Sequence, residues 1–281
     1  MRFLKKRGTI FGLKGFVTGD LAEPFVDRQR SQVLRELIVK EAATDGYLLM
    51  TVDVQAVAPH FWYVVRRWNA GCSIGIDAGS LDTWDEVRAK QEQHTIPDGS
   101  VFVDSGWDTA VVYQQCWRHH KPEIPYVKVQ RELGAPILNM PFCWQPMKGE
   151  DGRKPFTEKG TPSIFIRSFQ DPFFGSNQAG IWAVELIVFR GDACKDILEA
   201  LREKRMGSQT WEVLDSVADE TYQRHLMAEE NRAFVNAKTG RVAYKWAKVG
   251  GSRTPNHLLD CETMQIAAAL SLGLFQYEVK A

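Results

Sequence analysis

The chain has 281 residues, and its 35 Lys and Arg are balanced by 35 Asp and Glu, with 44% hydrophobic and 25% charged residues. This is the composition of a globular protein of one large or two modest domains, and it argues against a protein that grips nucleic acid through a broad basic excess. No apolar run of about 18 residues indicates a membrane span, and five scattered cysteines without a C-x-x-C pair argue against a disulfide framework or a zinc site.

Residues 1–47 are expected to form an N-terminal arm followed by a lead-in helix. The first 30 residues contain Gly, Pro and a basic cluster, but no sustained periodicity and no apolar stretch typical of a secretory signal. From residue 31 to residue 43 the apolar positions recur at helical spacing, which predicts a short helix. We expect a cytoplasmic protein without a membrane partner.

Two predicted strands end in an acid. Residues 48–55 are an apolar run typical of a strand buried on both faces, and such a strand rarely accepts an acid such as Asp53 without a partner. Asp53 is therefore either a turn-forming or ion-paired residue, or a metal ligand. A second strand of the same kind, residues 100–104, ends in Asp104 and is followed by Ser105 and Gly106, which favours the metal-ligand interpretation.

The order of predicted elements is that of a ribonuclease H-like α/β fold, with a mixed sheet flanked by helices. A three-strand meander is followed by a helix, the strand that ends in Asp104, a second helix and a further strand. In this plan a helical crossover lays residues 100–104 parallel to residues 48–55, so that Asp53 and Asp104 become neighbours. Besides these two strands, the predicted elements are strands 61–68, 72–77 and 126–129 and helices 81–94 and 109–118.

Residues 134–183 contain six prolines with many Gly and aromatic residues, and we expect a long irregular insertion held to the main body by its aromatic rings. A strand at 183–189 and a helix at 192–204 follow. Lys195 lies in the first turn of that helix, where the helix dipole disfavours a cation. A nearby acid cluster or a phosphate would account for it, and a solvated side chain is the alternative.

Two elements close the chain. Residues 234–246 predict a β-hairpin with a basic tip and outer strand, which is either a charged edge or a phosphate contact. Residues 256–270 predict a helix on which Asp260 shares a face with small and apolar residues, so it needs a cationic partner. Glu262 is expected to be solvated, and His257 either orients Asp260 or is structural. The basic residues of the hairpin are Lys238, Arg241, Lys245 and Lys248.

Together these residues resemble the nuclease domain of the phage large terminase subunit, the lambda-like DNA-packaging family. The resemblance covers most of the chain, and residues 21–24 are similar to the family's lead-in to this domain. It is carried by Val52-Asp53-Val54-Gln55, Val103-Asp104-Ser105-Gly106, Lys195 and the segment Asn256-His257-Leu258-Leu259-Asp260-Cys261-Glu262.

The resemblance implies a metal-dependent endonuclease, residues 48–281, that cuts double-stranded viral DNA during genome packaging in the cytoplasm of the infected cell. It also implies an ATPase motor, a small terminase subunit and a portal as partners. The chain contains no G-x-x-x-x-G-K-[ST] phosphate loop, so we expect the motor elsewhere and no nucleotide hydrolysis by these residues.

The expected active site consists of Asp53, Asp104 and Asp260. Three converging carboxylates can hold two Mg²⁺ or Mn²⁺ ions ~3.5–4 Å apart, with Asp53 bridging them. Lys195 and His257 would contact phosphate or orient the acids, and the hairpin cations would bind DNA. A junction resolvase or transposase-type nuclease with the same acid geometry is one alternative, and a non-catalytic docking module of a packaging motor is the other.

Overall fold

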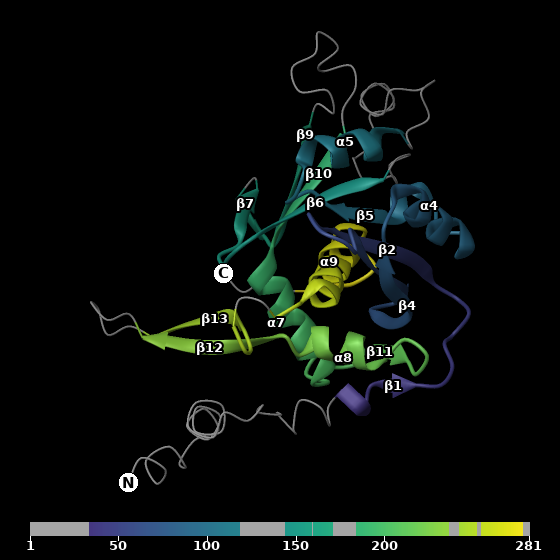
Figure 1. Cartoon of the computed structure of the whole chain (residues 1–281). Helices are drawn as coiled ribbons and strands as arrows, with labels where there is room; N and C mark the ends of the chain where they lie inside the picture. The colour runs from purple at the N-terminus through teal and green to yellow at the C-terminus, as the bar shows by residue number, and fades with distance from the viewer. Residues whose placement is uncertain are drawn as a thin grey trace. The chain divides into compact units, whose positions relative to one another are not determined.

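The structure is a computed structural model that describes residues 34–118, 144–158, 160–170, 184–235, 242–251 and 254–277. The chain divides into two compact units, residues 1–36 and residues 37–281. The larger unit contains a nine-stranded sheet in the order β1-β11-β4-β3-β2-β5-β6-β10-β9, which Figure 1 shows together with its helices.

The centre of this sheet matches the expected plan. Strands β2 (Tyr47–Val54), β3 (Phe61–Asn69) and β4 (Cys72–Leu81) form an antiparallel meander. Helix α4 (Trp84–Gln93) then leads to β5 (Val101–Asp104), which pairs parallel with β2. The structure is therefore a mixed α/β fold consistent with the ribonuclease H-like prediction.

The sheet extends on both sides of this centre. On one side β6 (Gln145–Glu150) and β10 (Val184–Arg190) continue parallel, and β9 (Phe165–Gln170) closes the edge antiparallel. On the other side β11 (Trp211–Leu214) pairs parallel with β4, and β1 (Ile38–Val39) pairs parallel with β11.

Helices lie on both faces of the sheet because the central strands are apolar on both sides. Along β2, Met50 and Val52 belong to a buried cluster that includes residues of α4 and of α5 (Thr109–Arg118). The intervening Thr51 faces the opposite side, where its Oγ1 donates to the Cys261 carbonyl of α9 (His257–Ser271) at 3.0 Å. Since side chains alternate along a strand, Asp53 lies on the same face as Thr51 and α9. Helices α7 (Gly191–Arg202) and α8 (Glu220–Leu226) contact α9.

Two segments differ from the sequence prediction. The helix expected over residues 31–43 is wrong at residues 38–39, since Ile38–Val39 form β1 against β11. The segment expected to be an irregular insertion supplies β6 and β9 to the main sheet and the small β7–β8 pair (Phe156–Glu158 and Thr161–Ser163). The prolines of this segment were expected to exclude strands. Pro146, however, lies near the start of a strand, where a missing N–H is tolerated. The strand expected at 126–129 lies outside the described residues.

The predicted hairpin is confirmed as β12 (Glu229–Val235) and β13 (Val242–Lys248), which form a separate two-stranded sheet. It is attached to α7 at Asp196, whose Oδ1 accepts from Trp246 Nε1 at 2.8 Å and whose carboxylate pairs with Arg153. Within the described ranges, no helix is long and apolar enough to cross a membrane.

Candidate active site

Asp53 and Asp104 end two neighbouring parallel strands. In the β2–β5 register Val52 lies opposite Val103, so the next residues, Asp53 and Asp104, lie side by side at the carboxyl edge of the sheet. This is the juxtaposition that the crossover predicted. Gly106 follows closely, and its backbone N–H donates to Asp104 Oδ2 at 3.2 Å. A Cβ at Gly106 would lie 3.1 Å from that oxygen, so a side chain here would crowd the carboxylate.

Asp53 is held in place by two side chains. Its side chain is only 7% exposed, and its Oδ2 lies 2.7 Å from Gln55 Nε2 and 2.9 Å from His257 Nδ1. The His257 ring stacks on Trp62 with the centroids 5.6 Å apart. The sequence left His257 either orienting Asp260 or structural, and in the structure the first turn of α9 directs its imidazole toward Asp53 at the end of β2.

Asp260 lies in a polar group formed by three different elements. Its Oδ1 is 3.4 Å from Lys195 Nζ of α7, and its Oδ2 accepts from Asn256 Nδ2 at 2.8 Å. Glu229, at the start of β12, bridges the same two partners, at 2.8 Å to Lys195 Nζ and 2.7 Å to Asn256 Nδ2. The acid cluster expected from the position of Lys195 is thus confirmed. Glu229 itself was missed, because it lies in a stretch without a recognisable pattern.

The three acids influence one another electrostatically. Burial raises the pKa of Asp104 to about 7, and the negative charges of Asp53 and Asp260 contribute to the rise. Burial likewise raises the pKa of Asp260 to about 7, where Lys195 opposes the rise and Asp53 and Glu229 add to it. Burial also raises the pKa of Asp53, against the opposing effects of His257 and Gln55. Asp53, Asp104 and Asp260 therefore form one group of like charges.

Lysines surround this group. For Lys195, desolvation works to lower the pKa, but the charges of Asp260 and Glu229 outweigh it and the pKa is raised. The charge of Lys248, at the end of β13, acts on Asp53, and that of Lys148, on β6, acts on Asp104. Lys148 was missed because it falls in the supposed insertion. Lys245 is exposed on the hairpin, whereas Lys238 and Arg241 lie outside the described residues.

The donor atoms of this group suit a hard divalent cation, because carboxylate oxygens are the ligands that Mg²⁺ and Mn²⁺ prefer. The raised pKa values of Asp104 and Asp260 fit this chemistry, since a nearby cation would relieve the repulsion between the acids. In the part of the chain that the structure describes, no three His, Cys, Asp or Glu side chains are arranged to hold a metal ion. Oxygens of Asp53 and Asp260 instead accept hydrogen bonds from His257 and Asn256.

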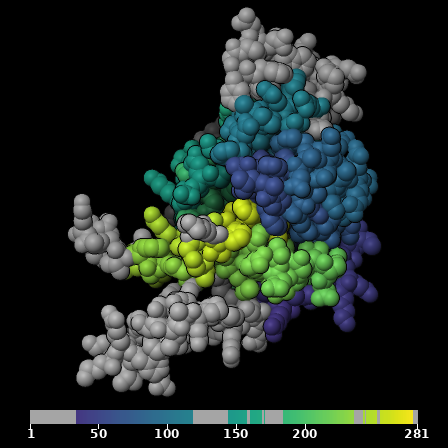
Figure 2. All heavy atoms as spheres, in the orientation of Figure 1, coloured from purple at the N-terminus to yellow at the C-terminus, as the bar shows by residue number. Residues whose placement is uncertain are grey.

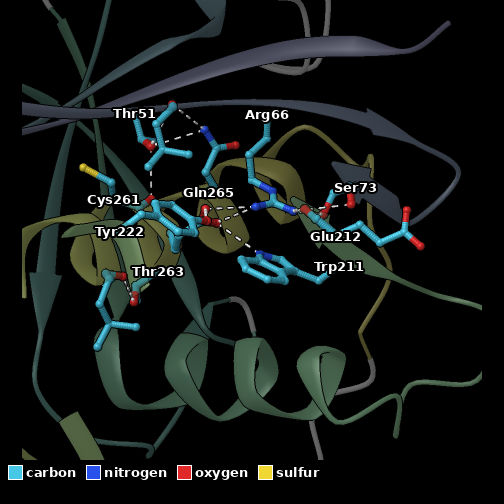
Figure 3. A network of polar contacts seen from close by, with 12 residues as sticks. Thr51, Arg66, Ser73, Trp211, Glu212, Tyr222, Cys261, Thr263 and Gln265 are labelled. Carbon is cyan, nitrogen blue, oxygen red and sulfur yellow. Dashed lines mark hydrogen bonds and ion pairs between the residues drawn. The ribbon is translucent and has the colours of Figure 1, made fainter. Parts of the chain in front are cut away.

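Helix α9 is fixed to the sheet by a separate buried network, drawn in Figure 3. Glu262, which was expected to be solvated, is fully buried, and its Oε1 lies 2.9 Å from Arg66 Nη1. Its carboxylate also accepts from Trp211 Nε1 at 3.1 Å and from the Tyr222 hydroxyl. One turn further, Gln265 Nε2 donates to the Leu49 and Val64 carbonyls, both at 3.1 Å. These contacts fix the helix that carries Asp260.

The acid group is formed by segments far apart in the sequence. Asp53, Asp104, Lys195 and Asp260 come from four elements, and in Figure 2 atoms of the C-terminal segment, coloured yellow, reach the surface between blue and green segments.

The family model described as terminase large subunit gpA, endonuclease domain, matches residues 2–279. Neither the search of curated proteins nor the search of solved structures gives a match.

Proposed function

The chain belongs to the family of terminase large subunit gpA endonuclease domains, and from its nuclease role in packaging we propose metal-dependent cleavage of double-stranded viral DNA. The proposal is supported by Asp53 and Asp104, which end neighbouring parallel strands, and by Asp260 of α9, whose charge acts on Asp104. Acids that raise one another's pKa at a strand edge are costly to the fold, and a purely structural role gives no reason to gather them.

Asp53, Asp104 and Asp260 would hold the divalent ions, Mg²⁺ or Mn²⁺. When bound, such ions activate water and stabilise the departing 3′ oxygen of a phosphodiester. His257 and Gln55 keep Asp53 oriented, and the Gly106 N–H keeps Asp104 oriented.

Lys195 and Glu229 have a positioning role at Asp260. Lys195 lies between the two acids and limits the repulsion between them, while Asn256 holds both carboxylates from the other side. Lys195 is 14% exposed, so it acts mainly on Asp260 rather than on a phosphate in solution. This arrangement keeps Asp260 near Asp53 while the site carries excess negative charge.

The basic hairpin would guide the DNA to the acids. Lys248 lies at its base, close enough for its charge to act on Asp53, and Lys245 is exposed three residues earlier on the same strand. Because β13 ends at Lys248 beside the acid group, cations along it can contact the phosphates of a DNA strand that leads to the acids. Lys238 and Arg241, on the connection between the strands, are proposed to extend this contact.

The partners follow from the family. We propose that the domain acts on double-stranded DNA in the cytoplasm of the infected cell, together with a packaging ATPase motor, a small terminase subunit and a portal. A neutral chain with a local basic hairpin depends on such partners to hold its substrate, since DNA affinity comes mainly from phosphate neutralisation.

A plasmid-nicking assay tests the proposal. Supercoiled DNA should be nicked or linearised with Mg²⁺ or Mn²⁺ and left intact with a chelator. In parallel, Mn²⁺ should raise the melting temperature of the wild-type protein, because an ion that binds only the folded state stabilises it. Intact plasmid with either ion, and a melting temperature unaffected by Mn²⁺, would refute metal-dependent cleavage.

A further inference from the structure

Beyond Gln55, the residue that contacts Asp53, is a pocket of about 460 Å³, and we propose that it receives one nucleobase of the DNA strand being cut, stacked on Trp107. The inference rests on the proposed nuclease function and adds how the substrate is held. The size lies in the range of pockets that bind small molecules, about 300–1,000 Å³. Its lining includes Gln55, Phe61, Trp84, Trp107, Val111 and Val112.

The pocket and the acid group share Gln55, and the pocket lies against α4 and α5 on the other face of the sheet from Asp53. Gln55 lines it, and the same side chain donates to Asp53 Oδ2 at 2.7 Å. On the β5 side, Trp107 follows Asp104 by three residues and also lines the pocket. A DNA strand that passes around the end of β2 at Gln55 can therefore bring a phosphate to the acids and a base to this cavity.

Trp107 is presented on a fixed loop. It is 55% exposed, an unusual state for a tryptophan, although the loop around it is closely hydrogen-bonded. Ser105 donates to the Met147 carbonyl from its N–H at 2.7 Å and from its Oγ at 2.8 Å, and Thr109 Oγ1 donates to the Ser105 carbonyl at 2.7 Å. Asp108 adopts a positive φ of 44°, which turns the chain directly after Trp107. The exposed indole is thus carried by a loop whose neighbouring residues are fixed by hydrogen bonds.

The opposite wall of the pocket is also aromatic. Phe61 is buried and lies 4.5 Å from Trp84, and Trp84 lies 6.2 Å from Trp144, measured between ring centroids. Flat apolar walls of this kind match the faces of a nucleobase, which stacks on aromatic rings regardless of sequence. The packed rings make this wall stiff, so a base can enter without rearranging it.

Charge favours a base over a phosphate as the occupant. Asp82 and Asp108 line the pocket, and carboxylates repel a phosphate while they accept hydrogen bonds from amino groups on a base edge. The lysines that suit the phosphate backbone lie elsewhere, at Lys148 and Lys248 beside the acids. The charges therefore favour a nucleotide whose phosphate lies at the acids and lysines and whose base lies in the pocket.

A base inside a duplex cannot reach such a pocket without leaving its stack. Extrusion costs a few kcal/mol in paired DNA and less where the strand is mismatched, frayed or single. The pocket should therefore favour DNA whose strand is locally open at the cut site, and it should contribute little to binding of an intact duplex.

The test is equilibrium binding of the full chain, measured by fluorescence anisotropy in chelator so that no cleavage occurs. The probes are a labelled single-stranded oligonucleotide and a blunt duplex of the same sequence. Trp107→Ala should weaken single-strand binding by about 5- to 100-fold, the loss of one stacked base, and duplex binding by less than about twofold. Trp107→Phe should retain most of the affinity. Tyr47→Ala is the matched control, because Tyr47 is 60% exposed at the opposite end of β2.

A second measurement needs no variant. The wild-type protein should bind the intact single strand more tightly than a strand of equal length with abasic residues at its centre, which keeps the phosphates. Unchanged single-strand binding by Trp107→Ala, an equal loss on both DNA forms, or equal affinity for intact and abasic strands would overturn the proposal.

Plasmid nicking separates this inference from the proposed function. If the wild type nicks the plasmid but Trp107→Ala does not affect binding, base binding in the pocket is refuted and the nuclease function stands. Base binding that depends on Trp107, without nicking under any divalent ion, would refute the nuclease and leave the pocket.

Discussion

Asp260 and Glu262 lie two residues apart on α9, and their surroundings differ in kind. Glu262 is fully buried with a guanidinium, an indole N–H and a phenol hydroxyl directed at its two oxygens. Asp260 is 36% exposed, and its nearest charges include Asp53 and Glu229 as well as Lys195. The more deeply buried acid is thus the better satisfied one.

The difference teaches how to separate structural from chemical acids. A buried carboxylate surrounded by donors serves the fold, because each of its lone pairs is occupied and its charge is matched. A carboxylate among other carboxylates costs stability, and the cost is relieved only when a cation arrives. The signs of the neighbouring charges distinguish Glu262, a structural acid, from Asp260, an acid suited to bind a cation. Burial alone would have marked Glu262 as the less stable of the two acids.

The largest expected effect comes from disrupting the buried network around Glu262. Arg66→Met leaves Glu262 buried without its cation, and we expect the free energy of unfolding to fall by about 3–5 kcal/mol. Chemical denaturation measures this loss. The double variant Arg66→Met, Glu262→Met removes the unpaired charge and should recover part of it. A stable single variant would mean that the ion pair does not hold α9 on the sheet.

The next largest effect comes from removing one charge from the group of Asp53, Asp104 and Asp260. Asp53→Asn, Asp104→Asn and Asp260→Asn should each reduce nicking by more than about 100-fold, since even residues that only orient metal ligands are worth about 10–100-fold. The metal-free variants should melt at the wild-type temperature or above it, because each loses a repelling charge. Melting curves with and without Mn²⁺ check both points, and full activity in any one variant would remove that residue from the site.

The pH dependence of stability sharpens the comparison. Asp104 and Asp260 have a pKa of about 7 in the folded protein against an ordinary value of 3.8, so between these values the metal-free folded protein binds more protons than the unfolded chain. Their contribution to stability therefore falls as pH rises through this window, by less than about 1.4 kcal/mol per pH unit for each extra proton because solvent screens Asp260. Unfolding in chelator at several pH values measures the slope.

Two controls define that slope. The variant Asp260→Asn should have a shallower dependence than the wild type, and Mn²⁺ should flatten the wild-type curve as well. A wild-type slope identical to that of Asp260→Asn would contradict the coupling between the acids.

The smallest effect concerns DNA binding by the β12–β13 hairpin. Lys245→Ala and Lys248→Ala should each lower the slope of log affinity against log salt by ~0.9, the loss of one phosphate contact. Titration of a duplex at several salt concentrations in chelator measures the slope. Lys204→Ala, on the turn after α7, is the matched control and should leave it unchanged. A salt slope unaffected by both hairpin variants would exclude the hairpin from the DNA contact.

The sequence by itself determined the central plan and the juxtaposition of Asp53 and Asp104. The apolar runs that end in Asp53 and Asp104 indicated strands because they are short, uncharged and bounded by turn residues. The crossover rule then placed these two acids together. The position of Lys195 in the first turn of a predicted helix suggested a nearby acid or phosphate, with a solvated side chain as the alternative, and the structure places it between Asp260 and Glu229.

Only the tertiary structure decided which other residues surround these acids. Glu229 and Lys148 lie in stretches without periodicity, and they reach the site because β12 starts beside α9 and β6 pairs with β5. Glu262 was assigned to solvent because helical spacing gives its direction but not what lies there, which is Arg66 from β3. The local spacing gave no sign of strand β1, because its partner, β11, lies 175 residues away in the sequence. Local patterns fix the elements, whereas long-range pairing fixes the partners, and the partners determine what each charge can do.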